Sequence, residues 1–147
     1  MKPLNPNFRE ETLKVFVRQG IVGHLGIEVD ELGEGWIQTS LRPGPHHTQQ
    51  DGFVHAGVLA TMADLSGGFA AHTLVAEKER VLTVEFKINF LRPALGDRIL
   101  CRSKVLKKGK SITISSSELF AVTGEREAEA MVAKAIVTLA IIVPKQE

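Results

Sequence analysis

One carboxylate stands alone in the most apolar part of the sequence. Residues 51–76 read DGFVHAGVLATMADLSGGFAAHTLVA, and after Asp51 the single charged residue is Asp64. Burying a carboxylate costs free energy unless the group is paired or functional, and no Lys or Arg lies within two helical turns of Asp64. A carboxylate in a dry cleft has a raised proton affinity, which suits a general base or a nucleophile. The alternative is a structural aspartate that is partly exposed or caps the backbone near residues 66–67.

The residues upstream of Asp64 are typical of a helix start that can hold a carbonyl oxygen. His55, Ala56 and Gly57 precede an apolar helical pattern, and the first N–H groups of a helix have no partner within it. Such groups stabilise an oxyanion, and small residues let a ligand approach the backbone. An ordinary helix start that bears a glycine has the same sequence, so this motif alone does not identify a site.

The spacing of His55 and Asp64 predicts a site shared between two chains. Nine positions separate them, and at about 100° per residue they project from nearly opposite sides of one helix. A two-fold dimer removes this difficulty, because each site then takes the helix start from one subunit and Asp64 from the other. We therefore expect a dimeric enzyme.

The elements around this helix are mostly strands. Apolar residues at helical spacing predict one long helix, at Val54, Val58, Met62, Leu65 and Phe69, and alanines and glycines form a second stripe on it. A first helix is expected from Pro6 to Gly20. Period-two alternation and turn residues predict six strands, at residues 25–32, 36–41, 82–90, 98–106, 111–122 and 130–143. The last is the most continuous apolar strand, so we expect it in a central place in the sheet.

This order of elements predicts an α+β fold. Hairpin-length connections make the sheet mostly antiparallel, and the long helix is the element able to fill its concave face. A chain of 147 residues suits one domain over residues 1–147, with a helical lead-in over 1–24 and the core over 25–144.

Composition argues against several classes of function. The net charge is +1, so no overall field attracts nucleic acid or an anionic membrane. Cys101 is the one cysteine, which excludes an internal disulfide and fits a reducing compartment. The N-terminus lacks a signal-peptide pattern, and glycines, histidines and Asp64 argue against a membrane span over residues 52–76. We expect a soluble cytoplasmic protein.

Other catalytic signatures are missing from the sequence. His46 and His47 lie in a polar loop without the ligand spacing of a metal site, and we expect them to shape the loop or touch a ligand. His24 and His72 are expected to be structural. The chain has no GxSxG motif, no P-loop and no dinucleotide fingerprint. We therefore expect neither a metal nor a cofactor.

Three segments of the chain carry a family resemblance. They read GPHHTQQDGFVHAGVLATMADLSGGFAA, VEFKINFLRPALGD and KKGKSITISSSEL, and they resemble the hotdog-fold acyl-CoA thioesterases, in particular the phenylacetate-pathway (PaaI-like) family. The resemblance runs from about Leu25 to the last strand. It implies a six-stranded antiparallel hotdog sheet wrapped around one central helix. It also implies hydrolysis of an acyl-CoA thioester to a free acid and coenzyme A by a homo-oligomer, a dimer or a dimer of dimers, with active sites at the subunit interface.

The resemblance assigns catalytic roles to five residues. Asp64 matches the catalytic carboxylate, acting as general base or nucleophile. His55 and the N–H group of Ala56 match the helix start that polarises the thioester carbonyl. Thr83 matches a hydroxyl that holds the attacking water. Gln49 stands where the family often has an asparagine that orients water or substrate.

Further residues are expected to contact the substrate. Gln50 follows Gln49 and offers a second amide, and Gly57 is the one glycine where the family usually has two. Four basic residues could meet the phosphates of coenzyme A, at Arg92, Lys107, Lys108 and Lys110. A solvated turn explains each lysine equally well.

Two rival functions stay open on the same fold. A hotdog (de)hydratase of enoyl or hydroxyacyl thioesters would pair a histidine with an acid, a role that His55 and Asp64 could imitate. The second rival is a protein that binds acyl-CoA without catalysing a reaction. The length of the resemblance favours hydrolysis. The acyl group is not defined by the sequence.

Overall fold

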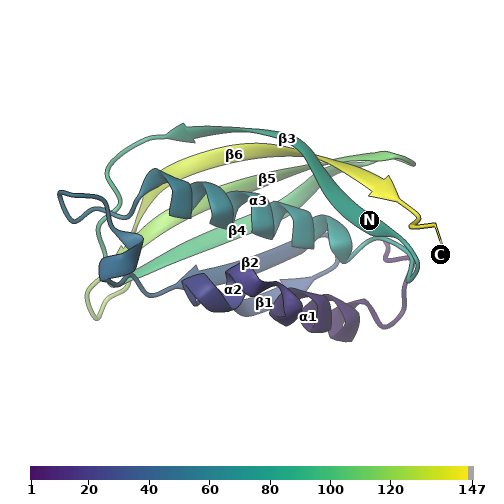
Figure 1. The fold of residues 1–147 in the computed structure, drawn as a ribbon, viewed down its shortest axis with the longest axis horizontal. Helices are drawn as coiled ribbons and strands as arrows, with labels where there is room; N and C mark the ends of the chain where they lie inside the picture. The colour runs from purple at the N-terminus through teal and green to yellow at the C-terminus, as the bar shows by residue number, and fades with distance from the viewer. Residues whose placement is uncertain (146–147) are drawn as a thin grey trace.

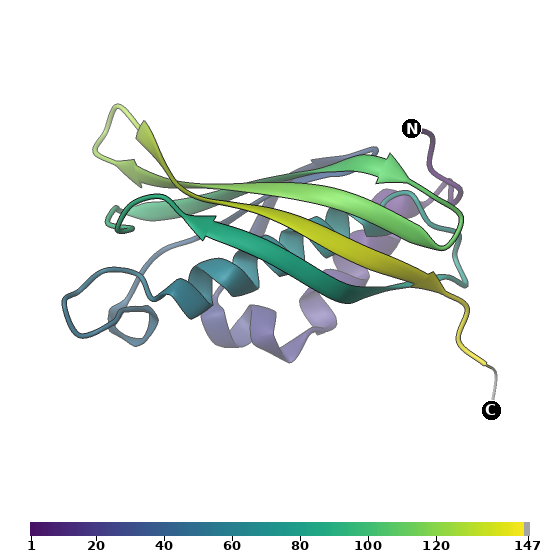
Figure 2. The ribbon, with the colours of Figure 1, turned by 90° about the horizontal axis from the view of Figure 1, so that it is seen from above.

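All three α-helices lie on one face of a six-stranded antiparallel sheet. The computed structural model describes residues 1–145. Its elements are α1 (Phe8–Arg18), α2 (Gly20–Leu25), β1 (Glu28–Gly33), β2 (Trp36–Leu41), the 3₁₀ turn η1 (Pro45–His47), α3 (Ala56–His72), β3 (Arg80–Phe90), β4 (Arg98–Lys108), β5 (Ile112–Thr123) and β6 (Ala128–Ile142) (Figure 1). The strands lie in the order β1-β2-β4-β5-β6-β3, and Figure 2 shows the helices together beneath them. The predicted hotdog architecture is confirmed.

The long helix α3 fills the concave face of the sheet. Met62, Ala63 and Ala70 are completely buried. Gly67 lies directly on the sheet, because a Cβ atom there would come within 2.9 Å of Val137 Cγ2. The stripe of small residues therefore brings α3 close to its own sheet. No helix within residues 1–145 is long and apolar enough to cross a membrane.

The N-terminal region differs from the sequence prediction. The first helix begins at Phe8 instead of Pro6, because the N–H of Phe8 donates to Asn5 O (3.2 Å) in a turn before it. Gln19 is extended (ψ 120°), so Gly20 starts the separate helix α2. Gly26 ends α2 in a left-handed conformation (φ 71°), which only glycine adopts easily. The strand predicted from residue 25 therefore begins at Glu28.

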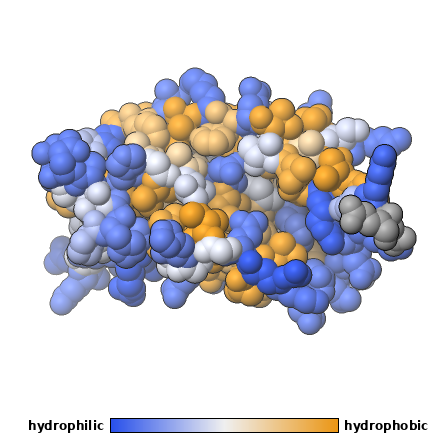
Figure 3. Space-filling view, viewed as in Figure 1, coloured by the Kyte–Doolittle hydropathy of each residue, from blue (hydrophilic) through white to orange (hydrophobic). Residues whose placement is uncertain are grey.

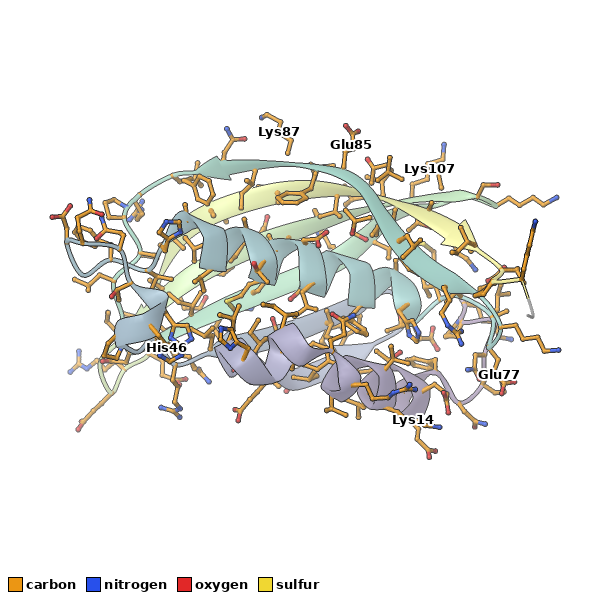
Figure 4. All side chains as sticks on the ribbon, viewed as in Figure 1. Lys14, His46, Glu77, Glu85, Lys87 and Lys107 are labelled. Atoms are coloured by element: carbon orange, nitrogen blue, oxygen red, sulfur yellow. The ribbon has the colours of Figure 1, made fainter. Side chains whose placement is uncertain are left out.

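The edge of the sheet is formed by β3, next to β6. β6 is an interior strand, paired with β5 on one side and β3 on the other, although β4 and β5 occupy the middle of the sheet. The apolar side chains of β3 are strongly exposed, with Leu82 at 55%, Val84 at 60% and Phe90 at 47%. Figure 3 shows apolar side chains gathered over this part of the molecule. Glu85 and Lys87 of the same strand point away from α3 (Figure 4).

Candidate active site

Asp64 lies in the middle of α3 and is hydrogen-bonded to the neighbouring strand. The Thr83 hydroxyl on β3 donates to Asp64 Oδ1 at 2.7 Å. Asp64 Oδ2 has no hydrogen-bond partner within residues 1–145. The carboxylate is half-buried rather than enclosed. One oxygen is therefore held in place and the other is free to act on a ligand.

A cavity of about 340 Å³ opens beside this pair. Four elements enclose it, since α1, α3, β3 and β6 all contribute side chains. Its wall is mostly apolar, formed by Val15, Leu65, Phe69, Val81, Leu82, Leu139 and Ile142. A carboxylate at the margin of an apolar cavity is a suitable arrangement for acting on an apolar substrate.

The start of α3 presents a free backbone donor. His55 is the residue before the helix, and its Nδ1 accepts the N–H of Gly57 at 2.8 Å. The N–H of His55 itself donates to His47 O at 2.8 Å. Within residues 1–145 the N–H of Ala56 has no acceptor. The imidazole thus caps its own helix, and Ala56 supplies the donor that remains for a ligand.

A second cavity, of about 380 Å³, surrounds this donor. Ala56, Gln49 and Arg92 line it, together with apolar residues that include Phe90. The amide of Gln49 is oriented by Asp51, because its Oε1 accepts the N–H of Asp51. Gln50 is exposed, donates to Asp51 Oδ2 at 3.1 Å and does not line the cavity. Of the two glutamines, Gln49 is the one placed to meet a ligand.

Within one chain the two groups of residues remain apart. Asp64 and Thr83 line one cavity, whereas Ala56 and Gln49 line the other. Asp64 follows Ala56 by eight positions, which is about 12 Å along the helix axis. The single chain therefore holds two half-sites, which we call the Asp64 half-site and the helix-start half-site.

The predicted basic residues do not form one cluster. Lys108 Nζ donates to Leu74 O just after α3, at 2.7 Å, so it stabilises the C-terminal end of that helix. Lys107 lies on the side of the sheet away from α3 (Figure 4), and Lys110 is exposed in the turn before β5. Of the four basic residues, Arg92 alone lines either half-site.

His47 in the upstream loop has bonds that hold the loop in place. His47 is buried, its Nδ1 accepts the N–H of Gly44 at 2.9 Å, and its Nε2 lies 2.8 Å from Leu25 O. These bonds hold the loop against the end of α2. Residues 1–145 contain no group of three or more His, Cys, Asp or Glu side chains placed to bind a metal ion.

Sequence reasoning missed the far side of the Asp64 half-site. His72, expected to be structural, lines the same cavity as Asp64, together with Gly68, Gln19 and Arg80. Burial, and the positive charge of Arg80, lower the pKa of His72 below its ordinary value of 6.5. The signal was present in the sequence, because Gly68 and His72 follow Asp64 at successive intervals of four residues.

Comparison with known proteins places this arrangement in a family. The model of the family described as "Thioesterase superfamily" matches residues 51–128. A curated protein of Haemophilus influenzae is 31% identical over 108 residues, which cover 73% of this chain and 78% of that protein. YigI of Escherichia coli, named a medium/long-chain acyl-CoA thioesterase, is 24% identical over 110 residues, or 65% of this chain and 71% of YigI.

Solved structures agree with the sequence relatives. The crystal structure of a thioesterase family protein from Silicibacter pomeroyi superimposes with a TM-score of 0.90 at 34% identity, covering 93% of this chain and 99% of that one. The family match spans more than half of the chain and includes Asp64, Ala56 and Thr83. The chain therefore belongs to the thioesterase superfamily, and the expected enzyme class, a thioester hydrolase, is confirmed.

Proposed function

We propose that this protein hydrolyses acyl-CoA thioesters to a free acid and coenzyme A, with Asp64 as the catalytic carboxylate. The observation that carries the proposal is the hydrogen bond from Thr83 to Asp64 Oδ1 (2.7 Å) at the margin of an apolar cavity. A carboxylate fixed at one oxygen and free at the other is suited to remove a proton from water or to attack a carbonyl carbon. The named activity of YigI on acyl-CoA supports coenzyme A as the carrier.

The complete site is proposed to form between two copies of the chain. β3 is an edge strand whose exposed apolar side chains favour pairing with another strand. An antiparallel two-fold pairing centred between Phe86 and Lys87 would set Thr83 opposite Phe90 of the second copy. Thr83 belongs to the Asp64 half-site and Phe90 to the helix-start half-site. The pairing would therefore bring one half-site of each kind together, twice per dimer.

In the proposed mechanism, each site uses catalytic groups from both copies of the chain. The N–H of Ala56, at the positive end of α3, binds the thioester oxygen as negative charge develops on it. Asp64 Oδ2 activates the attacking water or attacks directly, and Thr83 keeps the carboxylate in position. Gln49 orients water or substrate from the helix-start side, and Arg92 contacts the phosphates of coenzyme A. The C–S bond then breaks, and the thiolate of coenzyme A leaves with the proton that Asp64 took from water. After direct attack, water instead protonates the thiolate and hydrolyses the acyl anhydride on Asp64, which releases the free acid.

Thiol release from a panel of aromatic and aliphatic acyl-CoA thioesters tests this function. Several thioesters should be cleaved by the wild type, and Asp64→Asn should lower kcat by about a hundredfold or more, as expected for a lost base or nucleophile. Asp30→Asn is a matched control, because Asp30 is an exposed carboxylate on β1 that lines neither cavity.

Two results would contradict the proposal. If Asp64→Asn cleaves thioesters as fast as the wild type, Asp64 is not the catalytic group. If the wild type cleaves no acyl-CoA, the same preparation should be assayed for hydration of enoyl-CoA and for acyl-CoA binding without turnover, the two rival functions on this fold.

A further inference from the structure

The cavity of the Asp64 half-site extends along α3 toward a polar end. Gly68 and His72 follow Asp64 at intervals of four residues, so the three lie along one side of the helix over about 12 Å. Gly68 has no side chain, and a Cβ atom there would meet only Leu139 Cδ2, at 3.8 Å. The helix surface between Asp64 and His72 is therefore open, and it contributes to the wall of the cavity.

Arg80 lines the same cavity with part of its hydrogen-bonding capacity unused. Its Nη1 donates to the carbonyl oxygens of Glu77 (3.1 Å) and Glu79 (2.9 Å), which fixes the guanidinium at the start of β3. Within residues 1–145, Arg80 Nε and Nη2 have no acceptor, and no carboxylate forms an ion pair with Arg80. Arg80 is exposed, so these N–H groups are accessible to a ligand, and a guanidinium held in this way can bind a carboxylate.

Glu79 and Glu11, two of the acidic residues near this end, have other partners, and Glu77, which lines a neighbouring cavity with Arg80, forms no ion pair with it within residues 1–145. Glu79 Oε2 accepts the N–H of Ala76 at 2.8 Å, and Glu11 lies 3.6 Å from Lys14 Nζ. His72 Nδ1 lies 3.0 Å from Thr12 Oγ1. When the Thr12 hydroxyl donates to Nδ1, the neutral ring carries its proton on Nε2 and offers a further N–H. The far end of the cavity is thus rich in donors, whereas its wall is apolar.

We propose that this cavity receives the acyl group and that Arg80 binds a carboxylate at the end of it, so that the preferred substrates are coenzyme A thioesters of dicarboxylic acids. The inference rests on the proposed function, because Asp64 must mark the position of the thioester carbonyl. The methylene chain would pack on the apolar wall over Gly68. The terminal carboxylate would then reach Arg80, with Gln19 and His72 beside it.

Matched pairs of substrates test the inference. Each pair holds chain length constant and exchanges a terminal methyl for a carboxylate: butyryl- and succinyl-CoA, hexanoyl- and adipoyl-CoA, octanoyl- and suberoyl-CoA. We expect the carboxylate to raise kcat/KM most in the longest pair, by about tenfold, because only a long chain covers about 12 Å. Arg80→Met should remove this preference, chiefly by lowering kcat/KM for suberoyl-CoA. Lys78→Met, which removes a neighbouring charge outside the cavity, should keep the preference.

The outcomes separate this inference from the proposed function. If both members of every pair are hydrolysed equally well, or if Arg80→Met lowers both equally, the inference is wrong while thioester hydrolysis stands. A rise of KM in Arg80→Met that is the same for all six thioesters would assign Arg80 to coenzyme A and also overturn it. If the wild type cleaves none of the six, the proposed function fails and the inference fails with it.

Discussion

The two half-sites of α3 carry their chemistry on different parts of the chain. At the Asp64 half-site the groups proposed to act are side chains, the carboxylate of Asp64 and the hydroxyl of Thr83 that is hydrogen-bonded to it. At the helix-start half-site the important atom is the backbone N–H of Ala56, left free because His55 caps Gly57 instead. A side-chain group is lost by one ordinary substitution, whereas a backbone donor is lost only when the backbone changes. Alanine scanning would therefore detect Asp64 but not the backbone donor at position 56, which is already an alanine.

Ala56→Pro tests the backbone donor directly and should have the largest effect. Proline lacks the N–H and is well tolerated at the first helical position. His55 already has the extended conformation (φ −61°, ψ 139°) that a residue before proline prefers. We expect kcat for acyl-CoA hydrolysis to fall about a hundredfold, as for the loss of one oxyanion donor. Ala56→Gly keeps the N–H and should retain most of the activity. A native Tm with unchanged kcat in Ala56→Pro would show that this donor is not used.

Mixing two inactive variants tests whether the half-sites come from different chains. A dimer with one Asp64→Asn chain and one Ala56→Pro chain would contain one intact site and one doubly defective site. Unfolding and refolding an equal mixture should therefore restore roughly a quarter of the wild-type activity. Sedimentation should detect dimers or larger assemblies in each sample. If activity stays at the level of the separate variants while dimers form, both half-sites act within one chain.

Thr83→Val asks how much the hydrogen bond to Asp64 contributes. Valine has nearly the shape of threonine but cannot donate to Asp64 Oδ1, a bond of 2.7 Å in the native protein. A hydrogen bond to a charged group is worth about 1.5–3 kcal/mol, and the lower end applies to this exposed pair, so we expect kcat to fall by about tenfold. Thr83→Ser keeps the hydroxyl and should stay close to the wild type. Equal kcat in the valine and serine variants would mean that Thr83 only packs against α3.

The sequence was sufficient for the parts of the fold that repeat a simple pattern. Apolar spacing located α3 and the strands, and the opposite projection of His55 and Asp64 anticipated the two separate half-sites. The first helix was predicted to end at Gly20 and ends at Arg18, because Gln19 is already extended and its residue type does not indicate this. The short helix α2 was missed because Gly26, which ends it, was assigned to a strand.

The roles of individual side chains are harder to predict from the sequence than the fold, as the predicted substrate contacts show. Lys107 and Lys108 are adjacent in sequence, yet one lies on the outer side of the sheet and the other is bonded to Leu74 O near α3. The strand was predicted to end at residue 106, whereas β4 continues through Lys108, and successive residues of a strand face opposite sides of the sheet. Arg80 was not predicted as a site residue, because only the packing of α1 and β6 around α3 makes its position part of a cavity.

Substitution of His72 should change how stability depends on pH, and it should have the smallest effect of the changes described. Burial and the charge of Arg80 lower its pKa in the folded protein, against an opposing effect of Glu11. As the pH falls below about 6.5, His72 binds a proton in the unfolded chain but not yet in the folded chain. The free energy of unfolding therefore decreases on acidification until the pH passes the lower pKa of the folded protein. His72→Asn should keep an acceptor for Thr12 but not titrate. Its Tm should therefore fall less than the wild-type Tm between about pH 8 and about pH 5, with exposed His24→Asn as the control. Parallel Tm curves for all three proteins would show that the His72 ring is equally easy to protonate in the folded and unfolded states.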